Sequence, residues 1–132
     1  MRNATVAGAV GGCQAEVGIA SAMAASATVE LMGGSPEQSL AAASTVLMNM
    51  LGLVCDPVGG LVEYPCQNRN AAGVANATIA AEIALSGVRQ LIPFDEMLEA
   101  VYTVGNVFRQ SFARQPRRMR NDTFCMRSLP YV

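Results

Sequence analysis

Apolar residues recur at three- and four-residue steps along most of this chain, and no stretch alternates every second residue as a half-buried strand would. The pattern runs from Glu16 to Met32 and ends at Gly33-Gly34, a typical helix stop. The 52% hydrophobic content comes largely from alanine, with few aromatics, which favours close helix packing through small side chains. The sequence therefore predicts an all-α fold, a compact bundle of about four to five alanine-rich helices with a cysteine-bearing loop.

The clearest helix start follows that glycine pair. Ser35 stands at the N-cap, proline takes the first helical position and Gln38 the third, which together predict a capping box. We expect this second helix to end near Gly52 to Val54. Two further helices are predicted, from Arg69 or Asn70 to Leu85 and from Phe94 to about Val104.

The segment between the second and third helices is predicted to be a loop. Pro57, Gly59, Gly60 and Pro65 interrupt residues 55–66, so we expect no helix there. Cysteines stand at both ends of this segment, Cys55 and Cys66. A third, Cys13, follows Gly11-Gly12 at the mouth of the first helix, where unpaired N–H groups stabilise a thiolate.

Several classes of chemistry are excluded by composition. The nine basic residues are all arginine, so no lysine can form a Schiff base and pyridoxal phosphate is not expected as a cofactor. Without histidine there is no Ser-His-Asp or Cys-His arrangement. A net charge of −1 gives no reason to expect a nucleic acid, and no apolar stretch is long enough to predict a membrane span. We expect a cytoplasmic protein, in which thiols persist.

Cys13, Cys55 and Cys66 are the candidate metal ligands. Three thiolates on Gly/Pro-rich backbone suit an iron-sulfur cluster with one open coordination position better than a closed zinc site, which takes four protein ligands. Plain core packing of the cysteines and a Cys55–Cys66 disulfide are the alternatives. Glu16, Asp56 and Glu63 flank the thiols and are candidates for proton transfer or for helix-cap and turn roles.

Four segments of the chain closely resemble the C-terminal part of the alpha chain of bacterial iron-sulfur L-serine dehydratase. They are RNATVAGAVGGCQAEVGIASAMA, ELMGGSPEQ, LGLVCDPVGGLVEYPCQNRNAAGVANA and IPFDEMLEAVYTVG. The intervals of 41 residues between Cys13 and Cys55 and ten between Cys55 and Cys66 match the three cluster cysteines of that family. The resemblance implies that these three cysteines hold a [4Fe-4S] cluster.

The resemblance also implies a reaction and partners. The family converts L-serine to pyruvate and ammonia without pyridoxal phosphate, with an iron as Lewis acid for loss of the hydroxyl and a base for the Cα proton. No residue here is singled out as that base. The implied partners are L-serine, the beta chain or upstream domain of the same enzyme, and further copies of the chain in an oligomer.

Two departures from the family pattern set the expected domain boundaries. The family's upstream portion does not precede Met1, so residues 1–105 are expected to be a C-terminal piece of the alpha domain, inactive alone. Residues 106–132 replace the family's LRET-like and GGLA segments with a divergent arginine-rich tail, expected to be poorly ordered, and Cys125 in it receives no cluster role. A helical remnant or assembly module without a cluster, and a relative of the cysteine desulfidases, are the alternative interpretations.

Overall fold

The computed structural model describes residues 6–55 and 63–114 of the chain. These residues form helices and connections, with no strand among them. The elements are α1 (Gly8–Gly11), a π-helical turn η1 (Gln14–Gly18), α2 (Ile19–Leu31), α3 (Pro36–Met50), α4 (Glu63–Leu85) and α5 (Phe94–Arg114). The all-α prediction is confirmed.

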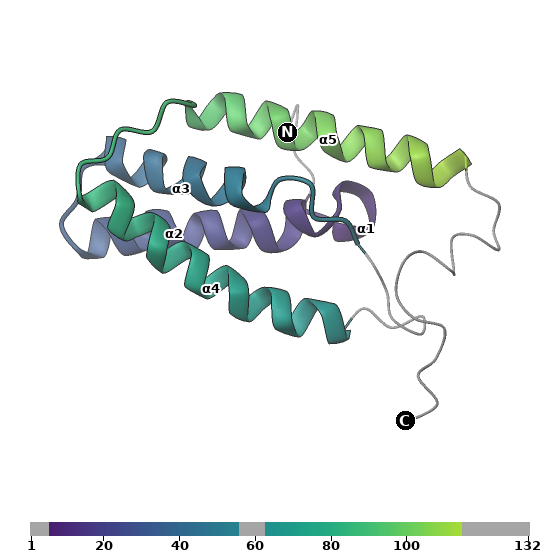
Figure 1. Ribbon diagram of the computed structural model, residues 1–132, viewed down its shortest axis with the longest axis horizontal. Coiled ribbons are helices and arrows are strands. Elements are labelled where there is room, and N and C mark those ends of the chain that lie inside the picture. The colour runs from purple at the N-terminus through teal and green to yellow at the C-terminus, as the bar shows by residue number, and fades with distance from the viewer. Residues whose placement is uncertain (1–5, 56–62, 115–132) are drawn as a thin grey trace.

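Three helices make the centre of the bundle. α2, α3 and α4 pack against one another, and α5 lies along the outer side of α3, away from α4 (Figure 1). Alanines with little or no exposed surface fill the contacts between the central helices, with Val29, Val46 and Leu47 as the larger members of the core. Small side chains at these contacts let the helix backbones approach closely, as the composition predicted.

The start of α3 has the predicted capping box. The Ser35 hydroxyl accepts a hydrogen bond from the backbone N–H of Gln38 at 3.3 Å, and the Gln38 side-chain oxygen accepts one from the backbone N–H of Ser35 at 2.9 Å. The Gln38 amide also donates to the Ala84 carbonyl at 3.0 Å, which ties this helix start to the end of α4. One residue thus caps its own helix and joins two helices.

The start of α4 differs from the prediction. It begins at Glu63, so Pro65 and Cys66 lie in its first turn and not at the end of a loop. Proline is tolerated in a first helical turn because the N–H it lacks would have no intrahelical partner there. Residues 56–62, with the remaining predicted loop residues, lie outside the described part of the chain.

The end of α5 also differs, since the helix continues through Gly105 to Arg114 instead of ending near Val104. Gly105 is buried, and a Cβ there would stand 3.3 Å from the Gly11 Cα. This glycine serves the close approach of α5 to α1 and does not stop the helix. The remaining tail, residues 115–132, lies outside the described residues, and its expected disorder stays a prediction.

No helix in the described ranges is long and apolar enough to cross a membrane.

Candidate functional site

Cys13 sits in a tightly built turn between α1 and η1. Its side chain is 1% exposed. The preceding Gly12 has a φ of 78°, and a Cβ at that position would lie 2.5 Å from the Leu53 carbonyl oxygen. Glycine is therefore required here both for the left-handed backbone and for the close approach of the segment after α3. A π-helical turn directly after the cysteine is a feature that often accompanies functional sites.

Gln14 fixes this turn to two distant parts of the chain. Its buried amide donates to the Val101 carbonyl of α5 at 2.9 Å, and its side-chain oxygen accepts from the backbone N–H of Gly52 at 2.9 Å. The backbone N–H of Gln14 also donates to the Leu53 carbonyl at 3.1 Å. The cysteine next to it is thereby held against the segment that leads to Cys55.

The other two cysteines come from different elements. Cys55 follows α3 at the end of the first described range, and Cys66 lies in the first turn of α4; both are half-buried. Cys55 and Cys66 are not joined by a disulfide, so that alternative is wrong. All three cysteines of the predicted site carry thiols.

Arg69 of α4 connects these elements. Its Nη1 donates to the Cys13 sulfur at 3.0 Å and to the Val54 carbonyl at 2.8 Å. Val54 is the residue before Cys55, and Arg69 lies three positions after Cys66 on the same helix. One guanidinium on the helix that carries Cys66 therefore contacts Cys13 and the residue before Cys55.

The electrostatics of Cys66 indicate how close the thiols lie. Burial raises the pKa of the Cys66 thiol above its ordinary value of 9.0. Negative charge on Cys13 and on the exposed Glu16 carboxylate raises that pKa further, as do a hydrogen bond with Cys13 and the charge on Cys55. A thiolate at Cys66 is therefore disfavoured, because it would meet the negative charge of these neighbours.

The donor set fits a thiolate-held iron-sulfur group. Within the two described ranges, no three His, Cys, Asp or Glu side chains are arranged to hold a single metal ion. A [4Fe-4S] cluster asks for something different, since each thiolate binds its own iron and the sulfurs need not converge on one point. Of the flanking acids, Glu16 acts on Cys66, Glu63 is exposed in the first turn of α4, and Asp56 lies outside the described residues.

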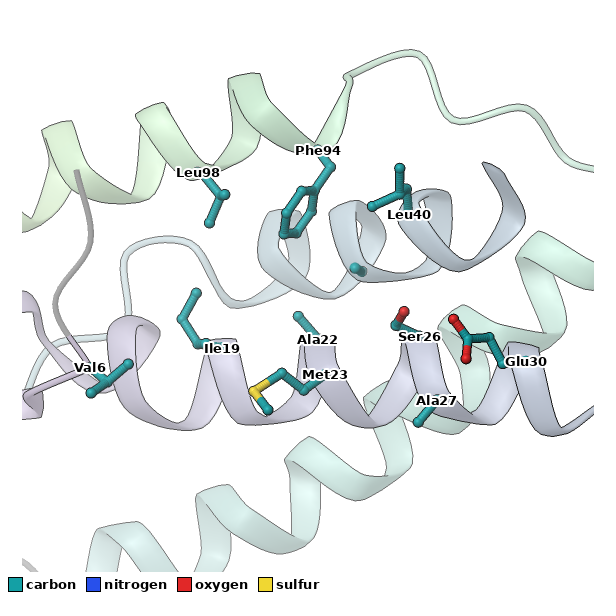
Figure 2. A pocket seen from close by; sticks show the side chains of 11 residues that line it. Val6, Ile19, Ala22, Met23, Ser26, Ala27, Glu30, Leu40, Phe94 and Leu98 are labelled. Carbon is teal, nitrogen blue, oxygen red and sulfur yellow. The ribbon is translucent and has the colours of Figure 1, made fainter. Parts of the chain in front are cut away.

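A groove lies between α2, α3 and α5, and none of the three cysteines lines it. It is an open groove of about 420 Å³. Figure 2 shows Ile19 and Met23 reaching into it from α2, Phe94 and Leu98 from α5, and Val6 at one end. Its polar groups are the Ser26 hydroxyl and the Glu30 carboxylate, both toward the other end. An apolar groove of this kind is suited to packing against another apolar segment.

Gln14 and Arg69 are site residues that the sequence reasoning missed. Helical spacing offered a signal for the arginine, because residues three apart share a helix face. That signal was hidden by the prediction that helix starts only after Cys66. Gln14 had no such signal, since its partners lie 38 and 87 residues further along the chain.

Comparison of the sequence with known proteins identifies the family of this chain. The sequence profile of the family described as serine dehydratase alpha chain matches residues 1–117. The chain belongs to the serine dehydratase alpha chain family. This match continues twelve residues past the expected boundary at 105, in keeping with the observed extension of α5.

Three relatives of this serine dehydratase family member have informative names. The L-serine dehydratase alpha chain of Peptoniphilus asaccharolyticus is 63% identical over 103 residues, and a probable L-serine dehydratase alpha chain of Bacillus subtilis is 61% identical over 103 residues. L-serine dehydratase 1 of Escherichia coli is 45% identical over 104 residues. Each match covers 78% of this chain but only 35%, 34% and 23% of the respective relative. The chain thus spans about a third, or less, of the length of these relatives.

Proposed function

We propose that this chain is the cluster-binding part of an L-serine dehydratase, the lyase that converts L-serine to pyruvate and ammonia. One observation carries the proposal: in a chain without lysine or histidine, Cys66 interacts with both Cys13 and Cys55, and Arg69 donates to the Cys13 sulfur and to the carbonyl beside Cys55. Cys13, Cys55 and Cys66 would hold a [4Fe-4S] cluster. When bound, the cluster supplies a Lewis-acidic iron at the position that no cysteine occupies.

The residues of the chain prepare that site in three ways. The Gly12 turn and the Gln14 amide hold Cys13 against the segment before Cys55, which supports a shared role for these two proposed ligands. Arg69 supplies positive charge and a hydrogen bond to the Cys13 sulfur, which fix the position of that side chain. The raised pKa of Cys66 keeps that thiol protonated until a cation displaces the proton.

Anaerobic iron-sulfur reconstitution tests the cluster. We expect about four irons per chain and a broad absorbance band near ~400 nm in the wild type, and loss of both in Cys55→Ser. Cys125→Ser is the matched control, because Cys125 has no proposed ligand role and its variant should load like the wild type. Absence of iron uptake by the wild type would support the alternative of a helical module without a cluster.

We further propose that serine turnover needs the rest of the alpha chain. Two thirds of the Peptoniphilus relative lies outside the matched region, and the apolar groove between α2, α3 and α5 offers a surface for an apolar segment from that remainder. Met23 and Leu40 on the groove are more than half exposed here. Val6, the first described residue, lines one end of the groove.

Co-expression tests this assembly. With serine as substrate, the reconstituted chain alone should be inactive, and co-expression of the unmatched part of an L-serine dehydratase alpha chain should restore pyruvate formation. Met23→Glu and Leu40→Glu should abolish co-purification of the two parts, whereas Leu91→Glu, at an exposed position outside the groove, should not. Pyruvate formation by the chain alone would contradict the proposal, as would groove variants that lose only self-association.

A further inference from the structure

The hydrogen bonds of Arg69 join three segments that are far apart in the sequence. Nη1 gives one hydrogen bond to the Cys13 sulfur, 3.0 Å away and 56 residues earlier, and one to the Val54 carbonyl, 2.8 Å away and 15 residues earlier. Arg69 itself stands one helical turn after Cys66. The same nitrogen therefore relates the position of Cys13 to the backbone beside Cys55, from the helix that carries Cys66.

The hydrogen bond from Arg69 to the Cys13 sulfur has a charged donor, unlike a hydrogen bond between two neutral groups. A guanidinium donor beside a thiolate makes a charge-assisted hydrogen bond, stronger than one between neutral groups. The arginine is half-buried, so solvent screens the interaction less than it would at an exposed position. Arginine also remains charged at every working pH, and its planar fork fixes the direction of both bonds.

We propose that Arg69 is a positioning residue for the cluster: it holds Cys13 in place for iron and tunes the cluster through an N–H···S bond to that ligand. This inference rests on the proposed function. Groups that hydrogen-bond to metal ligands orient them, and their loss typically costs about 10–100-fold in metal affinity. Hydrogen bonds to the sulfurs and nearby charge also set the reduction potential of iron-sulfur clusters.

The test compares Arg69→Met and Arg69→Lys with the wild type and with two controls. Arg89→Met removes an exposed arginine outside the site. Ser44→Ala removes a 2.7 Å hydrogen bond from the middle of α3 to the Ile92 carbonyl in the connection between α4 and α5. Ser44→Ala should lower the melting temperature without changing the surroundings of the three cysteines. Far-ultraviolet circular dichroism checks that each variant is folded.

Two measurements on the loaded protein separate positioning from general stability. With an iron chelator, Arg69→Met should lose its absorbance band at least about ten times faster than the wild type, with Arg69→Lys between the two. The reduction potential, from a redox titration followed by electron paramagnetic resonance, should move to a more negative value in Arg69→Met. Removing a positive charge and a donor disfavours the more negatively charged reduced cluster. Both controls should match the wild type.

A third measurement uses the protein without iron. Dibromobimane joins two adjacent thiols, and it should link Cys13 to Cys66 more slowly in Arg69→Met than in the wild type. If the wild type takes up no iron but this difference is present, the proposed cluster function fails, and tuning of the cluster fails with it, whereas the inference that Arg69 holds Cys13 in place beside Cys66 stands. If the wild type loads, but Arg69→Met keeps its cluster and potential or changes no more than Ser44→Ala, the inference is overturned. Should Arg69→Met fail to fold, Arg69→Lys decides by the same criteria.

Discussion

At the scale of single residues, two glycines with nearly the same backbone angle serve different purposes. Gly12 has a φ of 78° and Gly33 a φ of 81°. A Cβ at Gly33 would meet nothing within 4 Å, whereas a Cβ at Gly12 would overlap the Leu53 carbonyl oxygen. Gly33 only ends a helix, but Gly12 also lets the Cys13 turn touch the segment before Cys55.

This difference predicts unequal costs of the same substitution. Gly33→Ala should lower the free energy of unfolding by about 1 kcal/mol, the cost of a left-handed alanine. Gly12→Ala should lower it by about 3 kcal/mol or more, since backbone overlap adds to the same conformational cost. Urea unfolding of both variants measures the difference. Equal losses would mean that the close approach to Leu53 contributes nothing.

The Glu16 carboxylate gives a second prediction at this scale. Its charge contributes to the raised pKa of the Cys66 thiol, so Glu16→Gln should move that pKa back toward the ordinary value of 9.0. The rate of iodoacetamide labelling of Cys66 as a function of pH, in the protein without iron, reports the pKa. Glu63→Gln is the matched control and should leave the profile unchanged. A profile that Glu16→Gln does not move would place the carboxylate outside the thiol environment.

The residue scale also shows where sequence reasoning succeeded and failed. The sequence places Cys13 directly after Gly11-Gly12, and the structure shows that Gly12 permits a close backbone approach there. The ligand roles of the three cysteines stay a prediction. Gln14 was missed because its side-chain partners lie 38 and 87 residues away, and nothing local indicates such contacts. Arg69 was missed because the helix it shares with Cys66 was predicted to begin only after that cysteine.

At the scale of elements, the start of α3 was the most predictable feature of the chain. A serine N-cap, a proline and a glutamine act within four consecutive residues, so the sequence alone contains the whole interaction. The boundaries of α4 and α5 were predicted less well. Pro65 and Gly105 are usual helix breakers, but the first falls in a helix's first turn and the second is needed by a neighbouring helix.

The capping box predicts a pH-dependent contribution to stability. Ser35→Ala should lower the free energy of unfolding by about 1 kcal/mol at neutral pH. The Ser35 hydroxyl also holds the pKa of the Glu37 carboxyl below its ordinary value of 4.5. A lowered pKa gives stability that is present above pH 4.5 and is lost as the pH falls through the folded-state value. The difference in the free energy of unfolding between the wild type and Ser35→Ala should therefore become smaller in acid.

Thermal unfolding between neutral pH and acid measures this gap. Ser86→Ala serves as the control. The exposed Ser86 hydroxyl donates only to a carbonyl at the end of α4, so its loss should change the free energy of unfolding by less than about 0.5 kcal/mol. A gap that stays constant with pH would show that the serine does not act on Glu37.

At the scale of the whole molecule, the bundle depends on alanine at its helix contacts. Ala25, Ala42 and Ala80 have no exposed surface and belong to the same core cluster. Packing of this density leaves little room for added atoms. The alanine-rich composition predicted such close contacts, but not which alanines face inward, because so many helix positions carry the same residue.

Enlarging one inward alanine should separate the helices. Ala25→Leu should lower the free energy of unfolding by about 2 kcal/mol through overpacking. Ala72→Leu adds the same atoms at an exposed position of α4 and should change stability by less than about 0.5 kcal/mol. Chemical denaturation of the two variants gives the comparison. A tolerated Ala25→Leu would mean that the central helices can shift apart at little cost.

The contacts of Gln14 have a consequence for the order in which the protein is made. Its side chain reaches the carbonyl of Val101, 87 residues later, so the turn that carries Cys13 gains its last partner only once α5 has been synthesised. Contacts this distant in sequence form late, because a long loop must close first. The turn that carries Cys13 therefore reaches its full set of contacts only after α5 has left the ribosome.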